Sequence, residues 1–300
     1  MRTLILIFIF SLTCQARNLI TKIPPADGPA KYPPIPNIIG GTELPSGDKK
    51  YDSIIRISTN GAGCTASLVG PQAILTAAHC APTGSTSTFT IKGKQYSAKM
   101  TRSPLYPGVD HDLTLGKVSE KVEGVAYEQI TALKLNVEDP VVMYGYGCIT
   151  PGGGGGNDGI LRYGDSKIIS FASYNFVTRK PNGAALCFGD SGGPTFGFDG
   201  TQIGVASKGN ISDTSYLVNL TTQDSKSFFN TWAADNAVDI CGVTMDCLGP
   251  QPETIIVASD KLGELKFSLK PDTLDPEYVK RHMGMLINYL ETGITPNYCF

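Results

Sequence analysis

The sequence has little charge, few histidines and, beyond its first residues, no long apolar run. Only 17% of the 300 residues are charged and the formal net charge is -2. The chain therefore lacks the excess of basic residues that would indicate a nucleic-acid-binding protein. After the N-terminus no apolar run is long enough to span a bilayer. Of the 3 histidines, His79 and His111 lack further metal ligands at a useful spacing. We expect no metal, no cofactor, no nucleic-acid partner and no membrane partner.

Glycine and proline are abundant, with 34 and 20 residues, and 41% of the chain is hydrophobic. From Ile38 onward, short β-branched and apolar runs alternate with Gly, Pro, Asn and Ser. This spacing predicts an all-β barrel or sandwich, followed by one helix at Asp224–Ala234. The expected strands are Ser53–Ser58, Gln72–Ala77, Thr88–Ile91, Ala132–Leu135, Val141–Tyr146, Lys167–Phe171 and Gln202–Ala206.

The N-terminus has the pattern of a secretory signal peptide, residues 1–16. A short basic start precedes the apolar run Leu4–Phe10, and the small residue Ala16 offers a cleavage site. A buried core segment and a lipoprotein signal at Cys14 are the alternatives. The signal peptide predicts export, to the extracellular space or the periplasm.

Two further segments differ in texture from the strand-rich region. Residues 17–37 hold six prolines and little apolar periodicity, so they are expected to form a pro-segment or extended linker. Residues 236–300 contain strand-like runs at Thr254–Ser259 and Glu264–Leu269 and a helix-like run at Asp275–Thr292. These predict a small α+β extension. A pro-domain, an inhibitor, a targeting module and simple packing on the barrel all remain open for it.

The stretch LCFGDSGGP, residues 186–194, places Ser191 among glycines beside a carboxylate. Glycines let the backbone fold tightly enough for several N–H groups to point at one spot. A serine needs a positioned base to become a nucleophile. The candidate bases are His79, His111 and His282.

His79 ends an apolar strand-like run, where its side chain is presented rigidly. An orienting carboxylate is expected from Asp112, which begins an alternating apolar run, with Asp110 as the competitor. Cys64 and Cys80 lie 16 residues apart and form a natural pair. A disulfide there would anchor the backbone beside the base. Seven cysteines follow Ala16, so at least one stays unpaired within the chain.

Four motifs in this order resemble those of the chymotrypsin-like (trypsin-fold) serine endopeptidases: Asn37–Gly41, TAAHC at 76–80, DLTL at 112–115 and CFGDSGGP at 187–194. Tyr144–Gly147 resembles the family's Gly-Trp-Gly stretch. The resemblance spans residues 38–235 and implies two six-stranded antiparallel β-barrels with a C-terminal helix. It also implies a secreted endopeptidase that cuts protein or peptide substrates.

By this resemblance, Ser191 is the nucleophile, His79 the base and Asp112 the orienting group, while the N–H groups of Gly189 and Ser191 form the oxyanion hole. Asp190 pairs with the new amino group of Ile38 after cleavage, which makes the uncut chain a zymogen. A retained fold that binds protein without cutting it is the alternative.

The resemblance also locates a specificity pocket, with the neutral Ala185 where an aspartate would select Arg or Lys. An apolar or small residue is therefore expected before the cut. The remaining pocket residues are Ser207, Gly209 and Thr214, with Lys208 in place of the family's tryptophan.

Two departures from the family pattern affect the disulfides and activation. The usual partner of Cys187 is missing, so Cys148 is expected to replace it, Cys241 to pair with Cys247, and Cys299 to stay free. Asn37 stands before Ile38 where a basic residue is usual, so another protease is expected to cut there. The glycine run 152–156 falls where the family has a loop that orders on activation.

Overall fold

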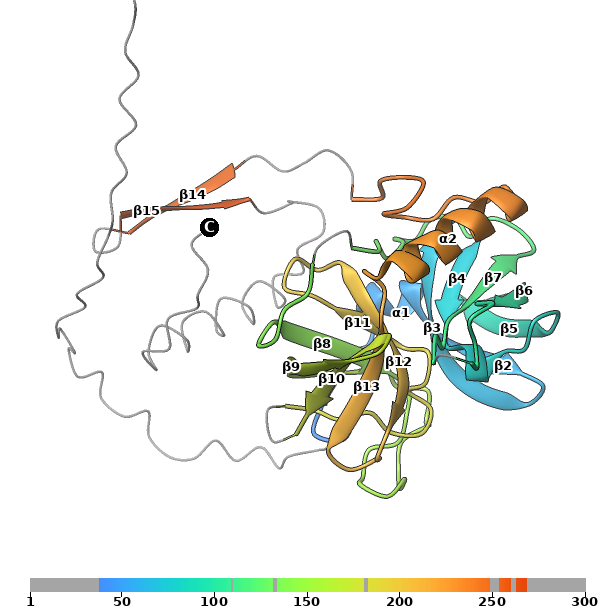
Figure 1. Cartoon of the computed structure of the whole chain (residues 1–300), viewed down its shortest axis with the longest axis horizontal. Coiled ribbons are helices and arrows are strands. Elements are labelled where there is room, and N and C mark those ends of the chain that lie inside the picture. Colours follow the sequence, from blue (N-terminus) through green and yellow to red (C-terminus); the bar gives the residue numbers. More distant parts are fainter. Residues whose placement is uncertain are drawn as a thin grey trace, which may run out of the picture. The chain divides into compact units, whose positions relative to one another are not determined.

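The computed structural model describes residues 38–108, 110–131, 134–180, 183–248, 254–259 and 263–268. The expected signal peptide, pro-segment and helix Asp275–Thr292 lie outside these residues, as does Cys299. Figure 1 shows two β-barrels side by side, the first in blue to green and the second in green to yellow.

Six antiparallel strands close the first barrel, in the order β2-β3-β4-β7-β6-β5. Buried and exposed residues alternate through most of β2, as expected for a strand with one face on the core. The turn Asn60-Gly61 joins β2 to β3 with positive φ at both residues, a typical hairpin pair. The strands are β2 (Ile54–Thr59), β3 (Ala62–Gly70), β4 (Ala73–Thr76), β5 (Thr86–Ile91), β6 (Lys94–Arg102) and β7 (Thr114–Val118).

The second barrel has the strand order β9-β10-β13-β12-β11-β8, closed by pairing of β8 with β9, and β1 adds to the edge of β9. All its pairings are antiparallel. The all-β class and the two six-stranded barrels are thus confirmed. The strands are β1 (Thr42–Glu43), β8 (Pro140–Gly145), β9 (Arg162–Ala172), β10 (Asn175–Arg179), β11 (Pro194–Phe196), β12 (Gln202–Gly209) and β13 (Thr214–Asn219).

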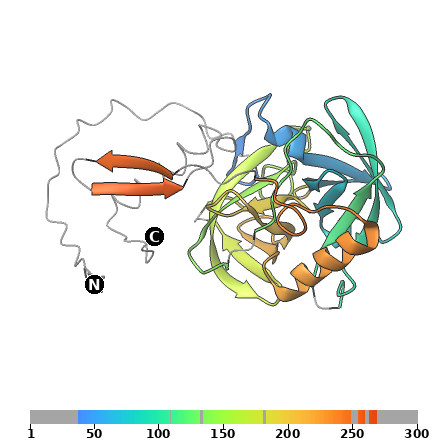
Figure 2. The ribbon, with the colours of Figure 1, turned by 90° about the horizontal axis from the view of Figure 1, so that it is seen from above.

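The helices are short apart from α2 (Gln223–Asn236), which covers the predicted helix and extends beyond both its ends. Thr222 caps its N-terminus, accepting a hydrogen bond from the Ser225 N–H. Phe229 and Trp232 pack into a core cluster that includes first-barrel residues such as Leu115. Figure 2 shows α2 lying along the barrels. The two short helical segments are α1 (Lys50–Ser53) and the 3-10 turn η1 (Ala78–Cys80).

One expected strand, Ala132–Leu135, is wrong where the structure describes it. Lys134 and Leu135 lie outside any strand, and nearby pairing is limited to an isolated bridge between Ile130 and Gln202. An apolar run can be buried as a loop without entering a sheet ladder, and Leu135 belongs to the second barrel's core cluster.

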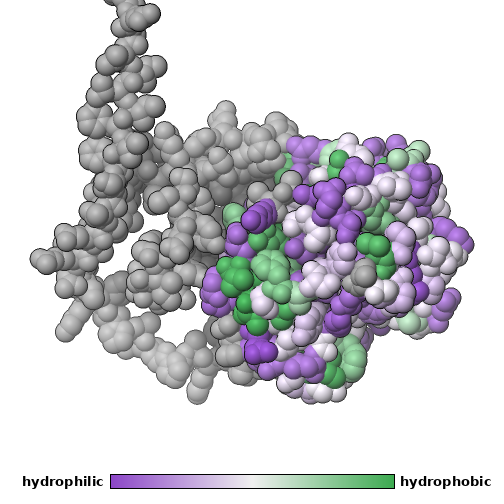
Figure 3. Space-filling view, in the orientation of Figure 1, coloured by the Kyte–Doolittle hydropathy of each residue, from purple (hydrophilic) through white to green (hydrophobic). Residues whose placement is uncertain are grey.

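In the C-terminal region, β14 (Thr254–Ser259) and β15 (Gly263–Ser268) form an antiparallel hairpin. No helix among the described residues is long and apolar enough to cross a membrane. Figure 3 shows apolar side chains gathered around β8 and β9 on a face that is otherwise mixed. Exposed large apolar residues of the second barrel include Val137, Phe171 and Phe198.

Candidate active site

His79 and Asp112 are in hydrogen-bond contact although 33 residues separate them. η1 follows β4 and Asp112 precedes β7, and these neighbouring strands bring Thr76 opposite Thr114. His79 Nδ1 lies 2.7 Å from Asp112 Oδ2, and the His79 backbone N–H donates to Oδ1 at 2.9 Å. With Nδ1–H directed at the carboxylate, Nε2 is the ring nitrogen left to accept a proton.

Asp112 is almost completely buried, and a third donor holds it. The Ser207 hydroxyl, on β12 of the second barrel, donates to Asp112 Oδ2 at 2.7 Å. Burial by itself raises the pKa of Asp112. The hydrogen bonds from His79 and Ser207 lower it by more, so the pKa lies below its usual value. Sequence reasoning placed Ser207 in the pocket wall and missed this bond, because no spacing signal links residues 95 apart.

Ser191 follows a tight turn, Cys187 to Asp190, in which the Asp190 N–H donates to the Cys187 carbonyl at 3.2 Å. Gly189 has a φ of 99°, a conformation that favours glycine. Among the described residues, the N–H groups of Gly189 and Ser191 have no hydrogen-bond acceptor. Two unpaired donors beside a hydroxyl can bind an oxygen that gains negative charge.

The Ser191 loop is held against the segment that carries His79. The Thr65 N–H, on β3, donates to the Ser191 carbonyl at 2.9 Å, and Cys80 Sγ lies 3.7 Å from the same oxygen. At Gly192, a Cβ atom would lie 1.9 Å from Thr76 Oγ1. Only a glycine allows this approach. The junction of the two barrels therefore assembles the candidate catalytic groups.

Asp190 is fully buried and accepts from two backbone donors, the N–H groups of Gly147 and Cys187, both at 2.8 Å. No described ion pair includes it. Burial is the main cause that raises its pKa, to about 7. Ile38 is buried in the second barrel's core cluster, and Ile39 bridges to Ala185.

The expected pocket residues carry no free charge. Ala185 is buried and neutral, and Gly209 lies close to Thr214, since a Cβ on Gly209 would be 2.6 Å from the Thr214 carbonyl oxygen. Lys208 Nζ pairs with Asp110. Asp110 was the competitor of Asp112 for orienting the base, and the structure places it on Lys208 instead.

The other candidate histidines differ from His79. His111 is fully buried, with Nδ1 at 2.5 Å from the Ser103 hydroxyl and Nε2 at 2.9 Å from the Ser225 hydroxyl. Both nitrogens are thus engaged in structural contacts. His282 lies outside the described residues.

The three disulfides join the same cysteines as the expected pairs: Cys64–Cys80, Cys148–Cys187 and Cys241–Cys247. The second ties the Ser191 loop to Cys148, shortly before the glycine run 152–156. The run forms part of a defined turn, in which the Ile149 N–H donates to the Gly154 carbonyl at 3.1 Å. A Cβ on Gly156 would lie 2.3 Å from the Gly147 carbonyl oxygen, so the close approach requires glycine.

Comparisons with known proteins point to one family. The Trypsin family model matches residues 38–227. Trypsin 5G1 of Aedes aegypti is 28% identical over 207 residues, covering 57% of this chain and 75% of that protein. A trypsin-like protease of Streptomyces glaucescens is 25% identical over 200 residues, covering 57% and 72%.

Solved structures show the same fold. Two mutants of human heparin binding protein superpose with TM-scores of 0.52 and 0.55, at 16% and 17% identity, and each alignment covers 66% of this chain and 97% of that one. At this identity the likeness concerns the fold alone. The family match, over more than half of the chain, establishes the relationship: the chain belongs to the trypsin family.

Proposed function

We propose that this chain is a secreted serine endopeptidase made as a zymogen, with Ser191, His79 and Asp112 as its catalytic residues. The observation that carries the proposal is the contact of His79 Nδ1 with Asp112 at 2.7 Å beside the Ser191 turn. The signal-peptide pattern of residues 1–16 and the three disulfides support secretion.

In this mechanism, Ser191 Oγ attacks the peptide carbonyl carbon and its proton passes to His79 Nε2. The carbonyl oxygen gains negative charge and is bound by the N–H groups of Gly189 and Ser191. His79 then protonates the leaving amine, and a water molecule repeats the steps to release the acyl group. Asp112 stays ionised, in keeping with its lowered pKa, and stabilises the protonated imidazole.

Activation is proposed to occur by cleavage between Asn37 and Ile38 by another protease. The buried carboxylate of Asp190 forms no ion pair among the described residues, and a new amino group at Ile38 would supply a partner. Ile39 already bridges to Ala185, which connects the N-terminal segment to the pocket. A salt bridge there would stabilise both the pocket and the oxyanion hole.

Substrates are proposed to carry an apolar or small residue before the cut. The neutral Ala185 offers no ion-pair partner for Arg or Lys. The charge of Lys208 is already paired with the carboxylate of Asp110. The catalytic domain is residues 38–235 and the extension, residues 236–300, has no assigned role.

The test is fluorophosphonate labelling of secreted chain, with N-terminal sequencing before and after treatment with candidate activating proteases. Labelling is expected only in chain that begins at Ile38, and Ser191→Ala, the matched control, should not label. A chain correctly cut before Ile38 that stays unlabelled would contradict the proposal and favour the alternative, a family member that binds protein without cutting it.

A further inference from the structure

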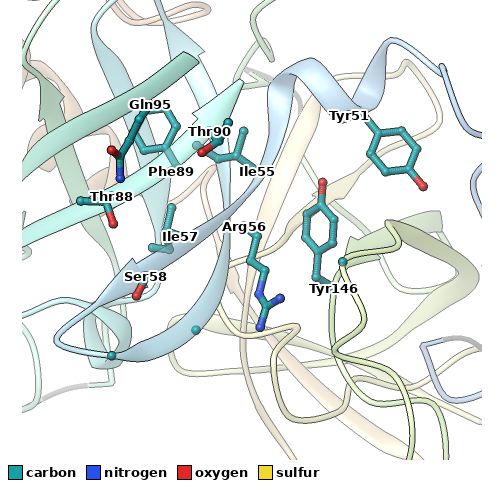
Figure 4. Close-up of a pocket in the computed structure, with 13 residues that line it drawn as sticks. Tyr51, Ile55, Arg56, Ile57, Ser58, Thr88, Phe89, Thr90, Gln95 and Tyr146 are labelled. Carbon is teal, nitrogen blue, oxygen red and sulfur yellow. The ribbon is translucent and has the colours of Figure 1, made fainter. Parts of the chain in front are cut away.

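A cavity of about 510 Å³ opens beside the β2–β3 hairpin, lined by residues of both barrels (Figure 4). Among the described residues that line it, Arg56 is the only charged one, and none is acidic. Figure 4 shows Arg56 between Ser58 and Tyr146. The cavity therefore has a positive charge in otherwise neutral surroundings.

The Arg56 guanidinium is exposed and available. None of the described ion pairs or side-chain hydrogen bonds includes it. It lies over Gly63, because a Cβ placed on Gly63 would be 3.6 Å from both Nε and Nη2 of Arg56. An arginine fork with free donors is suited to binding a carboxylate through two parallel hydrogen bonds.

The cavity adjoins the candidate catalytic groups through β3. Arg56 pairs across the strands with Thr65, whose N–H donates to the Ser191 carbonyl at 2.9 Å. Thr65 thus directs its backbone groups away from β2, and by the alternation of an antiparallel pair Gly63 does so too. The edge of β3 at Gly63 can therefore pair with an extended peptide.

The direction of such a peptide follows from the proposed function, on which this inference rests. The acyl half of the substrate enters the pocket at Ala185 and Thr214. The leaving half, whose amine His79 protonates when the bond breaks, lies on the side of His79. From there we infer that it extends along the disulfide Cys64–Cys80 toward Gly63. Gly63 lies two residues from Thr65, or about 7 Å along the strand, so the second or third residue after the cut reaches Arg56.

We propose that Arg56 selects substrates with an Asp or Glu side chain at the second or third residue after the scissile bond. The ion pair would form at a partly open cavity, where such pairs contribute modestly and weaken with salt. We expect kcat/KM to be about two- to five-fold higher with an acidic residue at that position than with alanine.

The test uses full-length chain cut before Ile38 and internally quenched peptides with one common acyl half. Asp, Ala or Lys is placed in turn at the first, second and third residues after the cut. Within each variant, the ratio of kcat/KM for the Asp and Lys peptides is compared. Arg56→Ala should bring this ratio close to one, and Arg56→Glu should invert it.

Lys121→Glu is the matched control, because it makes the same charge change at an exposed residue outside the cavity and should keep the wild-type ratio. Hydrolysis without an Asp preference at any position, or a preference that Arg56→Glu leaves unchanged, would overturn the inference alone. Absence of both hydrolysis and fluorophosphonate labelling would overturn the proposed function, and the inference with it.

Discussion

One buried carboxylate, that of Asp190, has two backbone donors in the uncut chain but no ion-pair partner among the described residues. Its two oxygens accept from the N–H groups of Gly147, which precedes Cys148, and of Cys187, so both donors lie at the disulfide Cys148–Cys187. These bonds do not offset burial, and the pKa stays raised to about 7. The residue is thus suited to respond to a positive charge that appears on cleavage.

Asp190→Asn should remove a pH dependence of stability from the uncut chain. The unfolded chain releases this proton near pH 3.8 and the folded chain near 7, so the stabilisation present below pH 4 is lost as pH rises to 7. The difference in unfolding free energy between wild type and variant should change by up to about 4 kcal/mol over that range.

Urea unfolding at about pH 4.5, 6 and 8 measures this difference in unfolding free energy. Groups that titrate alike in wild type and variant contribute equally to both and drop out of the difference. In chain cut before Ile38, the new amino group should favour the charged carboxylate and reduce the trend. A wild-type-to-variant difference that is constant with pH in uncut chain would contradict the raised pKa.

At the scale of elements, His111 joins the segment that precedes β7 and carries Asp112 to the start of α2. Its Nε2 contacts Ser225 in the first turn of that helix, and its ring packs edge-on against Tyr174 at 5.0 Å between centroids. Burial is the main cause that lowers the pKa of His111, against the opposing charges of Asp224 and Asp112. The positive end of the helix also disfavours a charged ring.

His111→Gln should make stability less sensitive to acid. Because the folded-state pKa of His111 lies below 6.5, both states are neutral above that pH and the full stability is present there. As pH falls below 6.5, the unfolded chain gains a proton that the folded chain does not, and stability is lost. Unfolding midpoints at about pH 7.5 and 5.5 should therefore differ less in the variant than in wild type. An equal loss in both proteins would contradict a lowered pKa.

For the whole molecule, the closeness of the two barrels at Gly192 decides whether the candidate catalytic groups meet. Gly192 belongs to the Ser191 loop of the second barrel, while Thr76 and Thr65 lie on strands of the first. A Cβ at Gly192 would be 1.9 Å from Thr76 Oγ1 and 2.3 Å from the Thr65 carbonyl oxygen. Such an atom would force the barrels apart at the site.

In chain cut before Ile38, Gly192→Ala should therefore destabilise the fold and abolish fluorophosphonate labelling. Gly84→Ala is the matched control, because Gly84 has almost the same φ, 83° against 82°, and nothing within 4 Å of its Cβ position. The control should lose only about 1 to 2 kcal/mol from backbone strain and keep labelling. Thermal melting and labelling of both variants measure this. Equal effects in the two would show that backbone conformation, and not contact between the barrels, is responsible.

Local sequence patterns were enough for the all-β class, for α2 and for several strands, because alternation, caps and turn residues act over a few positions. Motifs also singled out Ser191, His79 and Asp112. By contrast, Ala132–Leu135 has the apolar content of a strand, yet its described residues form none, since pairing depends on neighbours distant in sequence.

Only the tertiary structure decided which distant groups meet. It placed Ser207 on Asp112, Lys208 on Asp110 and Thr65 against the Ser191 loop. It also left Arg56, an ordinary outward residue of an alternating strand, without a described partner beside that loop. Contacts of this kind form because each sheet closes into a barrel and the two barrels pack together. A local sequence pattern does not specify which residues of distant strands then meet.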